Sequence, residues 1–145
     1  MILYLDTSAL VKLYVDEDDT SLVRDAVSDA KIVGTSEIAY VELRSAIARR
    51  HREGAIERAA YRRVLRDVEA DWQQLLLIAV NNQLVHDAGG IAERYGLRAY
   101  DAVHLASSLV LQTRAKETVT FACWDKALQS SAAAAKLQIL RTSRL

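Results

Sequence analysis

Two aspartates follow short apolar runs in this sequence. Asp6 comes directly after residues 2–5, and Asp125 comes directly after residues 119–123 and Trp124. Such runs predict buried strands, and parallel strands end at one edge of a sheet, where binding sites form. We therefore expect the two carboxylates to lie at that edge. The alternative is that each aspartate caps the helix that follows it.

Two further acids lie in predicted helices. Asp101 is in the first turn of a helix expected over 100–113, where the helix dipole alone favours an acid. Glu42 lies beside four positions expected to face inward, which are Ile38, Val41, Ser45 and Ala46. An unpaired buried carboxylate is costly, so Glu42 needs a cation. Arg49 or Arg98 could supply it, and a metal ion is the other possibility.

Four carboxylates at one sheet edge repel one another unless a cation lies between them. Two carboxylates about 4 Å apart repel by about 4 kcal/mol at an effective dielectric constant of about 20. Oxygen ligands without cysteine or histidine favour Mg²⁺ or Mn²⁺ over zinc. We expect His104 to support the site by packing rather than to bind the metal. Because Mg²⁺ keeps water and phosphate in its shell, the pattern indicates metal-assisted phosphoryl transfer.

Charge is segregated along the chain although its net value is zero. Residues 1–43 contain 3 Lys/Arg and 9 Asp/Glu, residues 44–66 contain 8 Arg and 2 Glu, and residues 67–145 contain 8 of each kind. Arginine donates paired hydrogen bonds to phosphate, so the middle segment is expected to bind phosphates on the approach to the acids. The alternative for each arginine is a solvated helix face. The arginines are Arg44, Arg49, Arg50, Arg52, Arg58, Arg62, Arg63 and Arg66.

Composition predicts one globular domain over 1–145, with 51% hydrophobic and 26% charged residues. The single cysteine, Cys123, cannot form an internal disulfide, and three scattered histidines do not build a zinc site. The longest apolar run, 75–80, is too short to span a bilayer, and the N-terminus lacks the features of a signal peptide. We therefore expect a cytoplasmic protein without a membrane segment.

Short apolar strands alternate with helices along the chain. Strands are predicted over 2–5, 31–34, 75–80, 119–123 and 137–140, and helices are expected to begin near 7, 18, 35, 55, 82, 100 and 126. Thr7 or Ser8 is the expected cap of the first helix, and Thr35 or Ser36 that of the third. This order predicts a three-layer α/β/α fold with a central parallel sheet.

Three segments resemble the motifs of PIN-domain proteins, particularly the VapC-type toxins. The segments are residues 2–14, 39–46 and 98–106, and their acids are Asp6, Glu42 and Asp101. In the fourth motif Cys123 stands where Thr or Ser is common, ahead of Asp125. Ser8 matches a hydroxyl position beside the first acid, where it could orient Asp6 or a metal-bound water, or cap the helix.

The resemblance implies an endoribonuclease that needs Mg²⁺ or Mn²⁺, acts as the toxin of a type II toxin–antitoxin system, and forms a homodimer. It also implies a cognate VapB-type antitoxin that occupies the active-site groove. Asp6 and Asp101 are the expected metal ligands, while Glu42 and Asp125 hold a second cation or position the water. Substrate contacts are expected from Ser8, Arg44, Arg49 and Arg50.

Two other functions are compatible with parts of the pattern. One is a catalytically degenerate PIN-like module that binds RNA or another protein and gains little stability from Mn²⁺. The other is a receiver-like or phosphatase domain with Asp6 as phosphoacceptor. The second is disfavoured because Ser8, rather than a second acid, stands two residues after Asp6.

Overall fold

Five parallel strands form the centre of the computed structural model, which describes residues 1–141. The strands lie in the order β3-β2-β1-β4-β5, so the first strand of the chain is the middle strand of the sheet. Their bounds are β1 Ile2–Leu5, β2 Ile32–Ser36, β3 Leu76–Ile78, β4 Val119–Ala122 and β5 Gln138–Ile139. The carboxyl ends of β1 and β4, which precede Asp6 and Asp125, are therefore neighbours.

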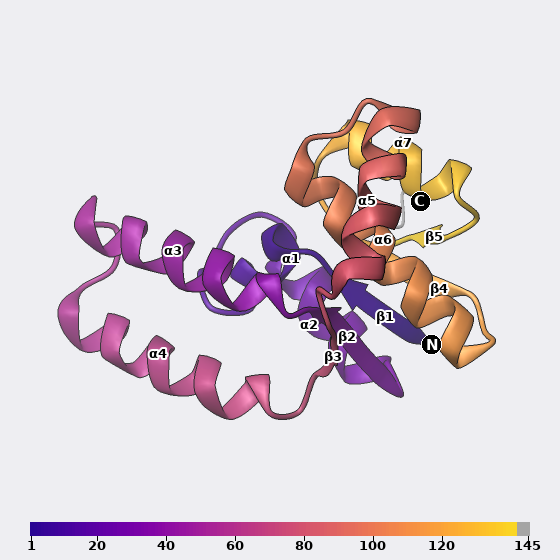
Figure 1. Cartoon of the computed structure of the whole chain (residues 1–145). Helices are drawn as coiled ribbons and strands as arrows, with labels where there is room; N and C mark the ends of the chain where they lie inside the picture. Colours follow the sequence, from indigo (N-terminus) through magenta and orange to yellow (C-terminus); the bar gives the residue numbers. More distant parts are fainter. Residues whose placement is uncertain (142–145) are drawn as a thin grey trace.

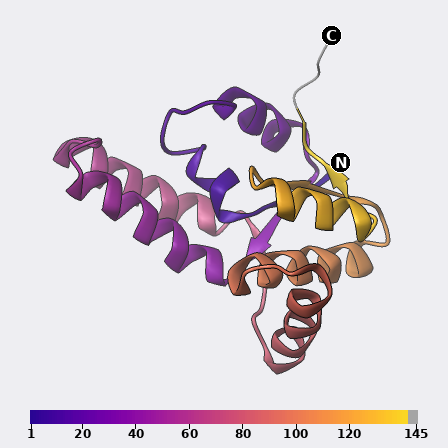
Figure 2. The ribbon, with the colours of Figure 1, turned by 90° about the horizontal axis from the view of Figure 1, so that it is seen from above.

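Helices cover both faces of the sheet, which confirms the three-layer α/β/α architecture (Figures 1 and 2). Alternate residues of β1 belong to different cores: Ile2 and Tyr4 pack with α5, α6 and α7, whereas Leu3 and Leu5 pack with α1 to α4. The helices are α1 Thr7–Val11, α2 Thr20–Asp29, α3 Ile38–Arg52, α4 Arg58–Trp72, α5 Asn82–Tyr95, α6 Ala99–Ala115 and α7 Lys126–Ala134. Burial of β1 on both faces explains its uninterrupted apolar sequence.

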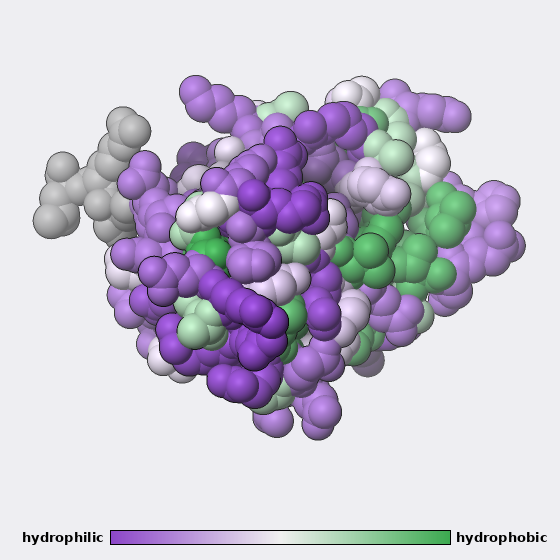
Figure 3. Space-filling view, turned by 90° about the vertical axis from the view of Figure 1, so that its left-hand side faces the viewer, coloured by the Kyte–Doolittle hydropathy of each residue, from purple (hydrophilic) through white to green (hydrophobic). Residues whose placement is uncertain are grey.

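The α3 and α4 helices form an antiparallel pair that projects from the sheet (Figure 1). The face at the tip of this pair is largely hydrophilic, and the apolar side chains visible from that side gather at one flank (Figure 3). This pair carries the arginine-rich segment predicted from the sequence. No helix within residues 1–141 is long and apolar enough to cross a membrane.

The first helix begins at Thr7 as predicted, but its cap is Asp6, the alternative considered, rather than Thr7 or Ser8. The predicted start of the third helix was wrong, because Thr35 and Ser36 extend β2 and pair with β3. The Ser36 hydroxyl accepts from the N–H of Ile38, where α3 begins, at 3.2 Å. The Thr35 hydroxyl, which could otherwise cap a helix, donates to the Leu5 carbonyl of the neighbouring strand β1 at 2.7 Å.

The predicted inward face of α3 was also wrong. Ala39, Leu43 and Ile47 are buried against the sheet, whereas Val41 is 67% exposed. Ser45 is exposed as well. The predicted inward face assumed that the helix begins at Thr35 or Ser36. Because β2 continues to Ser36 and α3 begins at Ile38, a different set of side chains faces the sheet. Glu42 is consequently half-buried at the border of the inward face and not within it.

Candidate active site

Asp6 is a buried carboxylate at the carboxyl end of β1, with 6% of its surface exposed. Its Oδ1 accepts hydrogen bonds from the Ser8 hydroxyl at 2.6 Å and from the Ala9 N–H at 3.0 Å. Burial raises the pKa of Asp6, and although His104 and these donors oppose it, the net shift is upward. Within residues 1–141 no cationic side chain forms an ion pair with Asp6. Such a carboxylate is an unusual feature that a bound cation would stabilise.

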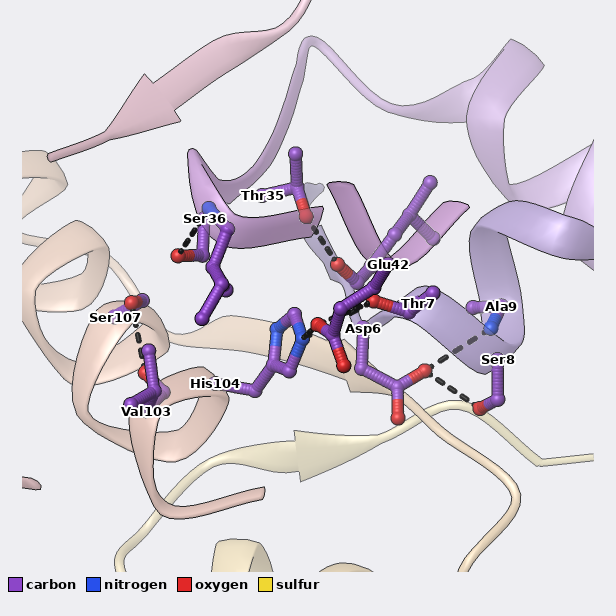
Figure 4. Close-up of polar contacts among 12 residues, drawn as sticks. Asp6, Thr7, Ser8, Ala9, Thr35, Ser36, Glu42, Val103, His104 and Ser107 are labelled. Carbon is purple, nitrogen blue, oxygen red and sulfur yellow. Dashed lines mark hydrogen bonds and ion pairs between the residues drawn. The ribbon is translucent and has the colours of Figure 1, made fainter. Parts of the chain in front are cut away.

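Glu42 points from α3 towards Asp6 and is held by two neighbours (Figure 4). Its Oε1 accepts hydrogen bonds from the Thr7 hydroxyl at 2.8 Å and from His104 Nε2 at 2.8 Å. Burial alone would raise the pKa of Glu42, but His104 and Thr7 outweigh it and lower the pKa. The alternative that an arginine neutralises Glu42 is not observed among residues 1–141, where the buried His104 pairs with it.

Asp101 and Asp125 share one arginine. Arg98 Nε lies 3.0 Å from Asp101 Oδ2, and Arg98 Nη2 lies 3.6 Å from Asp125 Oδ2. Asp125 also caps α7, since its Oδ1 accepts from the Leu128 N–H at 2.9 Å. The alternative that Asp125 caps a helix is therefore observed, and Arg98, which was considered as a partner for Glu42, lies between Asp101 and Asp125 instead.

Asp6 and Asp101 are close enough to interact electrostatically, and Asp6, Asp101 and Asp125 all lie near Cys123. Asp101 contributes to the raised pKa of Asp6, and the pKa of Cys123 is raised by burial and then by Asp6, Asp125 and Asp101. Residues 1–141 nevertheless contain no group of three His, Cys, Asp or Glu side chains already arranged to hold a metal. Arg98 pairs with Asp101 and Asp125, and His104 pairs with Glu42, so three of the four acids already have a protein partner.

The donor atoms still fit a hard divalent cation. The contacts described for residues 1–141 involve Asp6 Oδ1, Glu42 Oε1 and Asp101 Oδ2, so each of these acids keeps a second oxygen without a protein partner. Mg²⁺ typically takes one or two protein carboxylates and completes its shell with water and phosphate. A preformed cage of three or more protein ligands is therefore not required.

A groove of about 640 Å³ runs along α3 and includes Glu42, whereas Asp6, Asp101 and Asp125 do not line it. Thr7, Arg49, Arg50 and Tyr100 are among its other lining residues. Arg44, which we expected beside them, does not line this groove and instead donates to the Tyr40 hydroxyl at 2.8 Å and to Glu69 at 3.0 Å. Two of the three predicted arginines therefore line the same groove as Glu42.

Sequence reasoning did not single out Thr7 or Tyr4 as parts of the site. Thr7 was considered only as a helix cap, and Tyr4 only as a strand residue, yet the first binds Glu42 and the second binds His104 at 2.8 Å. His104 was expected to support the site by packing, and its buried position agrees with that expectation. The signal in the sequence was the spacing of Asp101 and His104. Residues three apart in a helix lie on one face, so this spacing places the histidine on the same side of α6 as a candidate acid.

Comparison with known proteins agrees with this architecture. The family model described as "PIN domain" matches residues 3–121. The chain is 30% identical over 138 residues to a protein named Ribonuclease VapC49 from Mycobacterium tuberculosis, covering 95% of this chain and 94% of that protein. Ribonuclease VapC3 from Pyrobaculum aerophilum is 27% identical over 108 residues, covering 73% of this chain and 80% of that protein.

Solved structures show the same fold at low sequence identity. The structure of FitAcB from Neisseria gonorrhoeae superposes with a TM-score of 0.65 at 18% identity and covers 97% of both chains. The structure of VapBC-1 from nontypeable Haemophilus influenzae superposes with a TM-score of 0.63 at 17% identity and covers 96% of both chains. From the family match and the related sequences together, this chain belongs to the PIN-domain family.

Proposed function

We propose that the protein is a metal-dependent endoribonuclease and the toxin of a type II toxin–antitoxin pair, built as one PIN domain over 1–145. The observation that carries the proposal is Asp6, a buried carboxylate without an ion-pair partner in residues 1–141, beside Asp101 at the carboxyl edge of the sheet. The related sequences named ribonucleases supply the substrate class.

Each acid has a distinct part in the proposed reaction. Asp6 and Asp101 would hold a divalent cation, and Glu42 and Asp125 would hold a second one or orient the attacking water. A bound Mg²⁺ or Mn²⁺ would polarise the phosphate and promote deprotonation of the water. Ser8 fixes the orientation of Asp6, just as Thr7 and His104 fix that of Glu42. Arg98 must release Asp101 before that carboxylate can use both oxygens.

No side-chain nucleophile is needed for this hydrolysis. Cys123 is the one strong nucleophile near the acids, but burial and the charge of Asp6 raise its pKa far above its usual value. Its thiolate is therefore scarce at neutral pH. Water is the proposed nucleophile, while the Ser8 and Thr7 hydroxyls donate to Asp6 and Glu42 and hold these carboxylates in place.

The groove along α3 is the proposed path of the RNA. Arg49 and Arg50 lie on its wall, and guanidinium groups bind phosphate through paired hydrogen bonds. Arg50 pairs with Glu17 at 3.3 Å and Arg49 with Glu53 at 3.1 Å, so phosphates would compete with exposed or partly exposed carboxylates. Such surface pairs are weak and exchange readily.

The partners proposed for this chain are a VapB-type antitoxin, an RNA substrate and a second copy of itself, in the cytoplasm. Structural relatives include VapBC complexes, which supports an antitoxin partner. Tyr100 lines the groove and is 59% exposed, and Val41, which precedes Glu42 on α3, is 67% exposed. Exposed apolar side chains beside a groove suit a protein interface.

Cleavage of RNA by purified wild type, Asp6→Asn and Asp101→Asn, with Mn²⁺ or with chelator, tests the function. We expect cleavage only by wild type with metal, while both variants keep their circular dichroism spectra. Asp25→Asn, on the exposed side of α2, is the matched control and should cleave normally. Undiminished cleavage by either active-site variant would refute the assignment.

Thermal unfolding with Mn²⁺ separates the enzyme from a degenerate binding module. A ligand that binds the native state raises its apparent stability by mass action, so wild type should unfold at a higher temperature with Mn²⁺ than with chelator. Asp6→Asn should lose that increase. RNA binding by the wild type without any response to Mn²⁺ would favour the degenerate module instead.

A further inference from the structure

A second pocket opens on the other side of Asp125, between α2 and α7. It has a volume of about 660 Å³ and shares no lining residue with the groove along α3. Trp124 and Lys126, the neighbours of Asp125 in sequence, both line it. The residues used below are Asp19, Leu22, Trp124, Lys126, Gln129 and Arg141. The groove thus includes Glu42, and this pocket reaches the chain on both sides of Asp125 through Trp124 and Lys126.

The indole of Trp124 is fixed in place by two polar neighbours. Its Nε1–H donates to Asp19 Oδ2 at 2.8 Å, and the ammonium of Lys12 lies 4.7 Å from the ring centroid. Lys12 is itself buried and donates to the Asp18 carbonyl at 2.8 Å. Lys12 covers one face of the ring and the core beside α1 to α4 covers another part of it, so only the exposed part of the ring lines the pocket. A rigid, partly exposed aromatic ring is a good stacking platform for a nucleobase.

Asp19 has an unusual local structure that serves this arrangement. It is the N-cap residue of α2, yet its side chain makes no capping hydrogen bond, and its φ of 66° is left-handed. An N-cap aspartate ordinarily accepts from the helix N–H groups, and the left-handed region is disfavoured for residues other than glycine. Here the carboxylate turns instead to an indole 105 residues away. The N-terminus of α2 therefore lacks a side-chain cap, and the Asp19 carboxylate instead accepts the hydrogen bond that holds Trp124.

Two exposed cations complete the pocket. Lys126 begins α7, and Arg141 follows β5. Neither forms an ion pair within residues 1–141, in contrast to Arg44, Arg49 and Arg50. Gln129, one turn after Lys126 on α7, adds an amide to the same wall. The pocket therefore combines an aromatic surface, an acidic acceptor and two cations free to bind an anion.

We propose that this pocket is a nucleotide subsite of the RNA substrate, next to the phosphate that is cleaved. The base would lie against Trp124 and Leu22, and its phosphate would bind Lys126 and Arg141. Asp19 Oδ1, whose partner oxygen already accepts from the indole, would accept from an exocyclic amine of the base. This inference rests on the proposed nuclease function and names the part of the chain that selects the base.

Nucleotide binding can be measured without metal or cleavage. In a Trp72→Phe background Trp124 is the single tryptophan, so its fluorescence reports on this pocket alone. With chelator present, we expect saturable quenching by GMP, AMP and CMP, and weaker binding of UMP, which has no exocyclic amine. Lys126→Ala/Arg141→Ala removes two exposed side chains and should weaken nucleotide binding by about tenfold or more.

Several controls make the fluorescence result specific. Arg114→Ala, an exposed arginine near the end of α6 and absent from the pocket lining, should leave nucleotide binding unchanged. Inorganic phosphate alone should bind more weakly than any of the nucleotides, since it lacks the base. Equal affinity of the double variant and its parent, or quenching by a glutamate-rich peptide but not by nucleotides, would overturn the proposal.

Cleavage assays separate this inference from the nuclease function itself. With Mn²⁺, the double variant should show a raised KM for RNA and altered positions of cleavage, with a smaller change in kcat. If wild type cleaves RNA and the double variant gives the same products at the same KM, the subsite is refuted and the nuclease function stands. If wild type cleaves no RNA but binds nucleotides through Lys126 and Arg141, the pocket is a nucleotide-binding site, while its role in RNA cleavage and the nuclease function both fail.

Discussion

His104 Nε2 lies 2.8 Å from Glu42 Oε1, across 62 positions of sequence. The other ring nitrogen, Nδ1, lies 2.8 Å from the Tyr4 hydroxyl. Burial raises the pKa of Tyr4 well above its usual value, so this hydroxyl stays protonated and can donate to Nδ1. Nε2 donates to Glu42, because a carboxylate oxygen can only accept. A buried strand residue thus contacts, through Nδ1, the histidine that holds the Glu42 carboxylate.

Replacing Glu42 by glutamine should cost more stability at neutral pH than in acid. The folded-state pKa of Glu42 is lowered, so its contribution is present above the unfolded-state pKa and is lost as pH falls through the folded-state value. We expect Glu42→Gln to lose about 1–2 kcal/mol near neutral pH and less near pH ~3. Urea denaturation at both pH values measures this, with Glu93→Gln on α5 as the control. An equal loss at both values would contradict it.

Asp6→Asn should stabilise the protein in chelator. The pKa of Asp6 is raised on folding, mainly by burial, so its favourable contribution is complete at low pH and lost as pH rises through the folded-state pKa. At neutral pH the ionised group is destabilising, and asparagine removes its charge, while asparagine Oδ1 can still accept from Ser8 and Ala9. A tenfold change in the acid dissociation constant of Asp6 on folding corresponds to about 1.4 kcal/mol in the free energy of unfolding. That free energy corresponds to roughly 2–5 °C in Tm. A lower Tm for Asp6→Asn would contradict this account.

Asp125 should have separable structural and chemical roles. Asp125→Asn keeps an oxygen that can accept from the Leu128 N–H, whereas Asp125→Ala removes the cap of α7. Loss of an N-cap costs about 0.5–2 kcal/mol, so only the alanine variant should unfold at a measurably lower temperature. Both variants should lose RNA cleavage. If asparagine retained full activity, Asp125 would be a cap and not a functional acid.

The arginines of α3 should differ in their effect on RNA binding. Arg49 and Arg50 line the groove, whereas Arg44 pairs with Glu69. Arg49→Ala/Arg50→Ala should weaken RNA binding and reduce its salt dependence, by about 0.7 in logarithmic slope for each phosphate that is no longer bound. Arg44→Ala should change neither quantity appreciably. Affinity measured over a series of salt concentrations tests this, and an equal effect of Arg44→Ala would argue against the groove as the RNA path.

Two glycines should respond oppositely to alanine. A Cβ at Gly34 would lie 2.9 Å from Leu111 Cδ2 and 3.3 Å from the Leu76 carbonyl, between β2 and its neighbours β3 and α6. Gly34→Ala should therefore destabilise the fold by about 1–3 kcal/mol. Gly89, within α5, has open space around its Cα, so alanine there should stabilise by about 0.5–1 kcal/mol. Denaturant midpoints for the two variants provide the test.

Much of the fold follows from local sequence. The apolar runs at 2–5 and 119–123 become adjacent buried strands because their side chains are nearly all apolar, and the helices between them supply the crossovers that parallel pairing needs. Asp6 and Asp125 then lie at one edge by connectivity alone, since each comes within a few residues after a strand ends. The acids on the helices were harder to place: the face of α3 was mispredicted because its rotation depends on where β2 ends.

The side-chain partners at the acidic edge were decided only by the tertiary structure. Strand order places β1 between β2 and β4, and this brings α3 and α6 over the end of β1, so that His104 rather than an arginine meets Glu42. The same packing puts Arg98 between Asp101 and Asp125 and joins Asp19 to Trp124. These interactions join residues as far as 105 positions apart, and periodicity and capping signals, which act within a few residues, carry no information about such pairs.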